Sequence, residues 1–132
     1  MDPHKEGRWK ELFEMFEKSL TLLETYIDEE QSNVLEIAGL IHFHEMCLEH
    51  ARKTLIAYLD AKGVSVSTSR QAVKESAKHL VISNESQWHR AFNRKNLVHF
   101  LFTEKVKKEL LADIQQTYYP MYKEFQRTLS EL

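Results

Sequence analysis

The sequence is poor in the residues that punctuate a chain, with three glycines and two prolines among 132 residues. Few hairpin turns can form without them, so long helices are favoured. The single cysteine, Cys47, excludes an internal disulfide and fits a reducing compartment. No apolar run approaches the roughly 20 residues that cross a bilayer, and no signal-peptide pattern opens the sequence. We therefore expect a cytoplasmic protein with no membrane association.

Apolar residues recur at helical spacing through most of the chain. The first stripe alternates steps of four and three and consists of Trp9, Phe13, Phe16, Leu20, Leu23 and Ile27. A second run, residues 33–62, is apolar on more than one face, which predicts a central helix contacted from several sides. Because 132 residues with 42% hydrophobic content suit one core, we expect a single domain over residues 1–132.

Three further helices are predicted after the central one. Gly63 should end the central helix, and Ser67 or Ser69 could cap a short third helix. The third helix would hold Ala72, Val73, Ala77 and Leu80, the fourth Trp88, Ala91 and Phe92 after a cap at Asn84, and the last Val106, Leu110, Ile114, Tyr118, Met121, Phe125 and Leu129 after Thr103 and Glu104. Pro120 should kink the last helix. The fold class predicted is all-α, a bundle of four or five helices.

Charge is divided along the chain, although the net charge is only −2. Residues 1–62 carry 7 Lys/Arg and 13 Asp/Glu, whereas residues 70–108 carry 9 and 3. The average argues against a nucleic-acid binder. The basic third is either a solvated helix face or a surface that meets phosphate.

The histidines of "HFHEMCLEH" do not form a recognised metal site. Glu45 follows His44, but position 48 is leucine, so the zinc motif HExxH is incomplete. No Glu-x-x-His di-iron pattern and no phosphate-binding or serine-hydrolase motif occurs. We expect no metal and no cofactor. His42, Glu45 and Glu49 would form a polar seam between helices or toward a partner.

The stretch "NRKNLVHF", residues 93–100, places Arg94 and His99 in an R-x4-H pattern between apolar residues. Arginine can grip phosphate with two parallel hydrogen bonds, and histidine can transfer a proton near neutral pH. Asn96 could orient the imidazole or bind a phosphate oxygen. On one helix a step of five separates the side chains by about 140°, so they converge only if the helix ends between them or a second copy supplies one. Alternatively, Arg94 pairs with a carboxylate such as Glu104 and His99 caps the last helix.

The order of several segments resembles one protein family over nearly the whole chain. These segments are "RWKELFEMFEKSLTLLE", "FHEMCLEHARKTLIAYLDAKGV", "SRQAVKESAKHLVI", "ESQW" and then R-x4-H. The chain resembles the nucleotidyltransferase substrate-binding proteins, helical members of the HEPN superfamily that are typically encoded beside a minimal nucleotidyltransferase. The resemblance implies a five-helix, up-and-down bundle that forms a homodimer, with Arg and His of both subunits near the dimer cleft.

Two positions depart from the family pattern. Lys95 stands where the family usually has asparagine, and Asn96 comes one position later. Leu101 replaces a tyrosine that the partner transferase can adenylylate in toxin and antitoxin pairs, so this modification cannot occur there. Conjectural substitutes for that tyrosine are Tyr118, Tyr119 and Tyr122.

The resemblance implies two competing functions. In the first, the chain is a non-catalytic subunit that binds a minimal nucleotidyltransferase and holds RNA or nucleotide through Arg94, Lys95, Asn96 and His99. In the second, it is a metal-independent ribonuclease toxin with Arg94 and His99 as catalytic residues, restrained by the transferase as antitoxin. A helical adaptor that has lost its transferase is a third reading. We favour the first, because the motif is degenerate and the whole-chain resemblance is to the substrate-binding branch.

Overall fold

A computed structural model describes residues 2–30, 33–100 and 103–132, with residues 95–100 described as backbone only. The described residues form helices and no strand, which confirms the all-α prediction. The elements are α1 (Pro3–Ile27), α2 (Val34–Ala61), α3 (Ser69–Lys78), α4 (Glu85–Phe100), α5 (Glu104–Asp113), the π-helical segment η1 (Ile114–Tyr118) and α6 (Tyr119–Ser130). Because α5, η1 and α6 follow one another without a break, they form a single rod. The described residues therefore form five helical rods. None of these helices is both long enough and apolar enough to span a bilayer.

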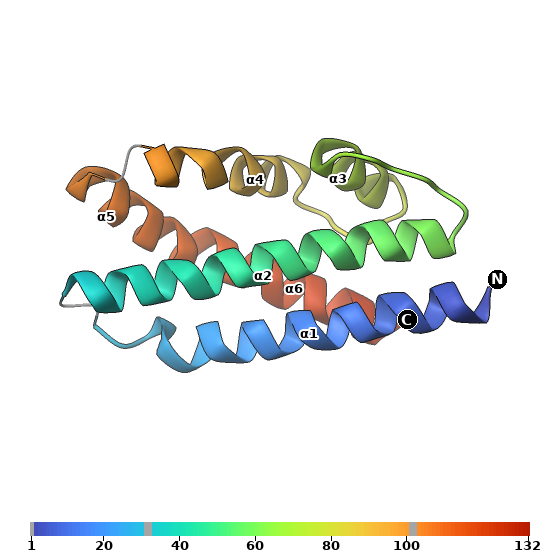
Figure 1. Cartoon of the computed structure of the whole chain (residues 1–132), viewed down its shortest axis with the longest axis horizontal. Coiled ribbons are helices and arrows are strands. Elements are labelled where there is room, and N and C mark those ends of the chain that lie inside the picture. Colours follow the sequence, from blue (N-terminus) through green and yellow to red (C-terminus); the bar gives the residue numbers. More distant parts are fainter. Residues whose placement is uncertain (1, 31–32, 101–102) are drawn as a thin grey trace.

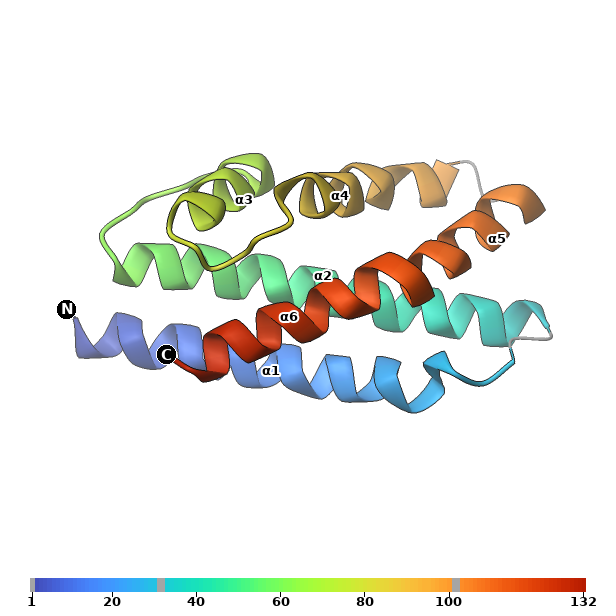
Figure 2. The ribbon, with the colours of Figure 1, turned by 180° about the vertical axis from the view of Figure 1, so that it is seen from behind.

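The helices lie lengthwise against one another (Figure 1). α1 and α2 form a long antiparallel hairpin, and α3 and α4 follow each other along one side of α2. The rod of α5, η1 and α6 returns diagonally across the other face of the hairpin (Figure 2). Contacts with α1, α3, α4 and α5 make α2 the central helix, as the sequence predicts.

Aromatic side chains fill the space between α1, α4 and α6. The whole predicted stripe of α1 is buried. Phe125 lies edge-on to Phe16 and to Trp88, with ring centroids 5.1 and 5.3 Å apart. Such pairs contribute roughly 0.5–1.5 kcal/mol each beyond burial. Cys47 is also in the core, and burial raises the pKa of its thiol to about 12, so the thiol stays protonated at neutral pH.

The start of α3 differs from the prediction by one residue. Thr68, rather than Ser67 or Ser69, is the N-cap, and its hydroxyl accepts a hydrogen bond from the Gln71 N–H. The Gln71 side chain in turn accepts from the backbone N–H and the hydroxyl of Ser67. This reciprocal arrangement is close to a capping box, in which a Gln or Glu lies three residues after the N-cap. Gln71 lies three residues after Thr68, so the motif makes Thr68 the N-cap.

The end of α3 also differs from the prediction. Leu80 lies outside the helix, is 83% exposed and has a φ of +58°. Its N–H bonds the Ala77 carbonyl, and the next N–H, of Val81, bonds the Ser76 carbonyl. This turn closes the helix through a left-handed residue, as helix ends commonly do. The apolar spacing alone extended α3 two residues too far.

The predicted start of the last helix is confirmed. The Thr103 hydroxyl caps α5 by accepting from the Val106 N–H. Further along, Pro120 lacks a backbone donor, and the disturbance lies just before it, where the rod widens into η1. There the Tyr119 N–H donates to the Ile114 carbonyl, five residues back. Single π turns of this kind are often found at functional sites.

Candidate functional site

Arg94 lies on the side of α4 that faces the end of α5. Its guanidinium pairs with the Asp113 carboxylate and donates to the Tyr118 hydroxyl over 3.4 Å. Arg90, one turn earlier on α4, reaches the same carboxylate oxygen at 3.1 Å. Burial lowers the pKa of Arg94, but the bonds to Asp113 and Tyr118 outweigh it and raise the pKa above its ordinary value. The side chain is therefore a fixed, ion-paired cation.

Arg94 forms an ion pair, but its partner is Asp113 and not Glu104, the carboxylate that the sequence suggested. Glu104 bonds Lys107 on its own helix, at 3.3 Å. Nine residues separate Glu104 from Asp113, which is about 14 Å along a helix. Because α4 approaches the far end of α5, Asp113 is within reach of Arg94 and Glu104 is not.

A buried histidine lies behind this ion pair. The His44 ring of α2 stacks on Tyr118, with centroids 5.1 Å apart and planes at 13°. Its Nδ1 lies 2.9 Å from the Tyr122 hydroxyl. Burial, and secondly the positive charge of Arg94, lower the pKa of His44 to about 3, so the ring is neutral at pH 7. Arg94, Asp113, Tyr118, His44 and Tyr122 thus form one connected group, which we call the Arg94 cluster.

The Arg94 cluster leaves almost no free volume. The hollow beside Arg94 and His44 holds about 10 Å³ and is otherwise lined mainly by aliphatic side chains. That is room for one water molecule at most. Within this chain the cluster can therefore orient Arg94 but cannot enclose a ligand. A ligand or a partner can reach Arg94 only through the 17% of its side chain that is exposed.

A comparison with known protein families gives the same family as the order of segments in the sequence. The family model described as "Nucleotidyltransferase substrate binding protein like" matches residues 11–131. The chain belongs to this family. The match begins in the third turn of α1 and runs to the end of α6, so the Arg94 cluster lies inside it. No curated protein matches the sequence.

The remaining predicted binding residues, Lys95, Asn96 and His99, lie on the last turns of α4. Their side chains are outside the described residues, and their roles stay predictions. The backbone nevertheless answers one question about the R-x4-H pattern. α4 continues to Phe100, so the helix does not end between Arg94 and His99. Of the two arrangements that could bring them together, only a second copy of the chain remains.

The tyrosines proposed as substitutes for adenylylation differ in accessibility. Tyr118 and Tyr122 have no exposed surface and belong to the Arg94 cluster. Tyr119 is half-buried, and burial followed by a hydrogen bond with Glu24 raises its pKa. Only Tyr119 of the three could accept a modifying group without opening the core.

The polar seam predicted on α2 stays a prediction, and its residues differ in their surroundings. His42 is exposed, whereas Glu49 holds Arg52 of the next turn with two bonds of 2.5 and 3.0 Å. In the described part of the chain no cluster of His, Cys, Asp or Glu side chains could hold a metal ion.

Sequence reasoning found Arg94 but missed the rest of its cluster. A signal was present for His44, which is an ionisable residue within the apolar stretch of the central helix. Asp113 and Tyr118 carried no such signal, because their roles depend on how α5 and η1 pack against α4.

Proposed function

We propose that this protein is a non-catalytic subunit of a minimal nucleotidyltransferase and presents the molecule that the transferase modifies. The observation that carries the proposal is the family match over residues 11–131. In the proposed complex, Arg94, Lys95, Asn96 and His99 hold RNA or nucleotide on the last turns of α4. The transferase supplies the catalytic groups.

The environment of Arg94 favours this function over a ribonuclease. A ribonuclease would need the guanidinium free to meet the charge that develops on the phosphorus centre. Arg94 is instead neutralised by Asp113 and held by Tyr118. A paired arginine of fixed geometry suits recognition, in which one or two donors meet a phosphate oxygen without the pair being broken.

The proposal includes the assembly. Residues 1–132 would act as one domain in the cytoplasm and form a homodimer, in which Arg94 of one copy approaches His99 of the other. The uninterrupted α4 supports this arrangement, because one copy alone cannot bring the two positions together.

The first test is co-expression of the chain with a minimal nucleotidyltransferase encoded beside it. Size exclusion with light scattering should give one complex that contains two copies of this chain. Arg94→Ala should keep that complex but lower the transfer of labelled nucleotide to the acceptor in cell extract, by about tenfold or more for a lost charged hydrogen bond. Arg127→Ala, an exposed arginine on α6, is the matched control and should behave as wild type.

Two results would contradict the proposal. Separate elution of the two proteins at low salt would remove the partnership. If the chain alone cut single-stranded RNA without divalent metal and Arg94→Ala stopped it, the ribonuclease function would replace the one proposed.

A further inference from the structure

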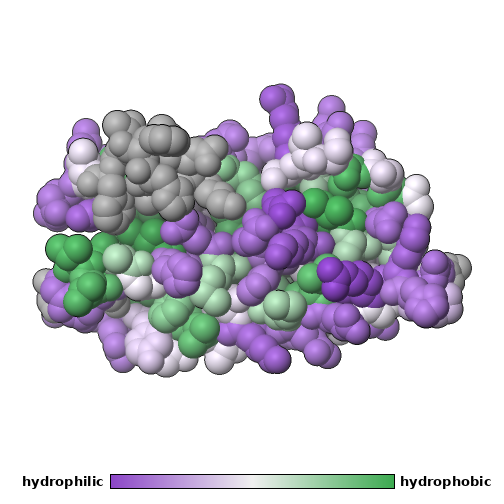
Figure 3. All heavy atoms as spheres, viewed as in Figure 1, coloured by the Kyte–Doolittle hydropathy of each residue, from purple (hydrophilic) through white to green (hydrophobic). Residues whose placement is uncertain are grey.

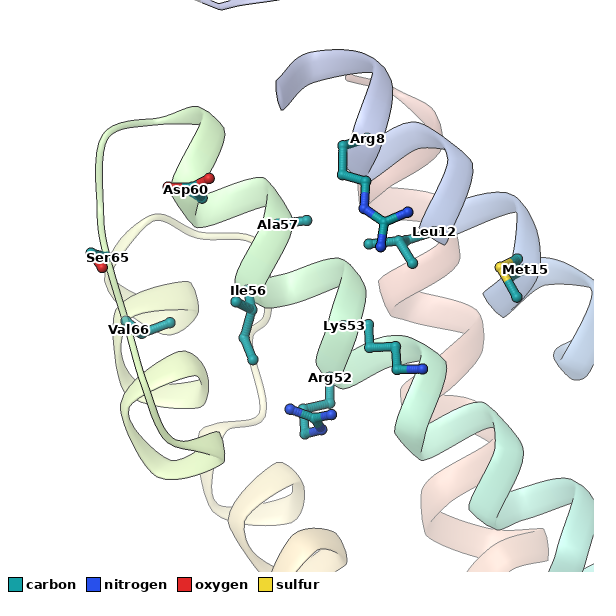
Figure 4. Close-up of a pocket in the computed structure, with 10 residues that line it drawn as sticks. All are labelled: Arg8, Leu12, Met15, Arg52, Lys53, Ile56, Ala57, Asp60, Ser65 and Val66. Atoms are coloured by element: carbon teal, nitrogen blue, oxygen red, sulfur yellow. The ribbon is translucent and has the colours of Figure 1, made fainter. Parts of the chain in front are cut away.

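A second candidate site lies at the opposite end of the helical hairpin from its turn, where α1 begins and α2 ends. A surface groove of about 660 Å³ opens there. The last turns of α2 form its floor, α1 forms one wall, and Ser65 and Val66 form the other (Figure 4). The volume is within the range of small-molecule sites. It is also much larger than the hollow at Arg94.

The floor and walls of the groove combine apolar surface with several charges. Ile56 and Ala57 lie in the middle of the floor, and Met15 on the α1 wall is 47% exposed. Three cations border the same space: Arg8, Arg52 and Lys53. An apolar surface bordered by fixed charges is typical of pockets that orient a small amphipathic ligand.

The cations differ in whether a carboxylate already neutralises them. Arg52 is held by Glu49 through two bonds. Neither Arg8 nor Lys53 forms an ion pair with any residue in the described ranges. Figure 4 shows both extending into the space between α1 and α2. Two unneutralised cations from two helices therefore face the groove, an arrangement that favours an anion with several oxygens.

The polar groups at the other end of the groove have a different character. Asp60 and Ser65 border it there, and Lys5 pairs with Asp60 at 3.3 Å. Seven residues of α2 separate Lys53 from Asp60, about 10 Å along the helix axis. The groove thus has Lys53 at one end, apolar surface with Arg8 beside it in the middle, and at the other end a carboxylate and a hydroxyl that can accept hydrogen bonds from a ligand.

We propose that this groove binds a phosphate monoester that carries a flat apolar ring system, of the nucleoside monophosphate class. Arg8 and Lys53 hold the phosphate, and the ring lies over Ile56 and Ala57. Asp60 and Ser65 meet the donors on its polar edge. The groove shares no residue with the Arg94 cluster, so the inference does not depend on the function proposed above.

Calorimetric titration of the full chain with adenosine 5′-monophosphate tests the assignment. Inorganic phosphate and adenosine serve as separate probes of its two parts. The monophosphate should bind more tightly than either part alone. Arg8→Gln and Lys53→Gln should each weaken its binding by about tenfold, because each removes a charged hydrogen bond. Both residues are exposed, so the variants should fold as wild type, which circular dichroism can verify.

Arg127→Gln is the matched control, since it removes an exposed arginine outside the groove, and it should leave binding unchanged. Three results would overturn the proposal: no binding of the monophosphate at millimolar concentration, binding that neither groove variant alters, or phosphate alone binding as tightly as the monophosphate.

Discussion

The fold strongly constrains the ionisation of His44. It is buried, stacked on Tyr118 and bonded to Tyr122, and its pKa of about 3 keeps it neutral through the physiological range. In the unfolded chain its pKa returns to about 6.5. Between these values the unfolded state binds a proton that the folded state does not. Stability from His44 is therefore complete above pH 6.5 and is lost as the pH falls toward 3.

The first prediction at the residue scale follows from this difference. Each pKa unit corresponds to about 1.4 kcal/mol, so His44 should remove about 2 kcal/mol of the free energy of unfolding between pH 6.5 and pH 5. Urea denaturation at pH 7 and pH 5 measures that loss. Glutamine cannot titrate, so the free energy of unfolding of His44→Gln should fall by about 2 kcal/mol less than that of the wild type. His50, whose pKa burial also lowers, is present in both proteins and cancels in the comparison. Equal losses in the two proteins would show that His44 titrates normally.

The Arg94 cluster shows which part of a site a sequence can reveal. Arg94 stood out because of a spacing pattern and a family resemblance. Its partner Asp113 lies 19 residues later, on the next helix, and looks like any exposed helix residue in the sequence. The pairing exists because α4 meets the end of α5 at a particular angle. No local pattern encodes that angle.

At the scale of elements, the helices were largely predictable and their ends were less so. The apolar stripes of α1, α2 and the last rod follow from periodicity, which is a repeated signal. A helix end depends on one or two hydrogen bonds. For α3 the prediction weighed only residue type, and Ser67, Thr68 and Ser69 can all cap a helix; the Gln three residues after Thr68 was a signal that it did not use. The π segment η1 was also missed, since Pro120 signals a disturbance without specifying its form.

The prediction for this scale distinguishes the cap from its neighbour. Thr68→Ala should lower the free energy of unfolding by about 1 kcal/mol, because the Gln71 N–H loses its acceptor. Ser69→Ala is the matched control within the first turn, and it should change stability by less than half as much. Denaturant unfolding of both variants gives the comparison. A larger loss of stability for Ser69→Ala than for Thr68→Ala would show that Ser69 is the N-cap, as the sequence analysis allowed.

At the scale of the whole molecule, folding brings most of the acidic residues of the first half of the chain together at one end of the α1–α2 hairpin. Residues 17–45 carry seven carboxylates and one lysine, and the rest of residues 1–62 is balanced. Because α1 and α2 are antiparallel, these acidic residues lie together around the turn of the hairpin. Figure 3 shows hydrophobic side chains gathered over the first turns of α2 at this end. Val34 and Leu35, which begin α2, are 60% and 85% exposed.

This charge distribution makes a prediction about the proposed complex with the transferase. If either charged region faces the partner, affinity should fall as salt rises, because exposed charges are screened within about 10 Å at 0.1 M salt. Charges at the rim of an interface act mainly on the association rate. The double variants Asp28→Asn with Glu30→Gln and Lys74→Gln with Lys108→Gln neutralise two exposed residues in the acidic and the basic region respectively. Surface plasmon resonance should show a several-fold slower association rate for one of them, with the other unchanged. Wild-type affinity that is independent of salt, together with unchanged rates in both variants, would mean that the charge division serves solvation alone.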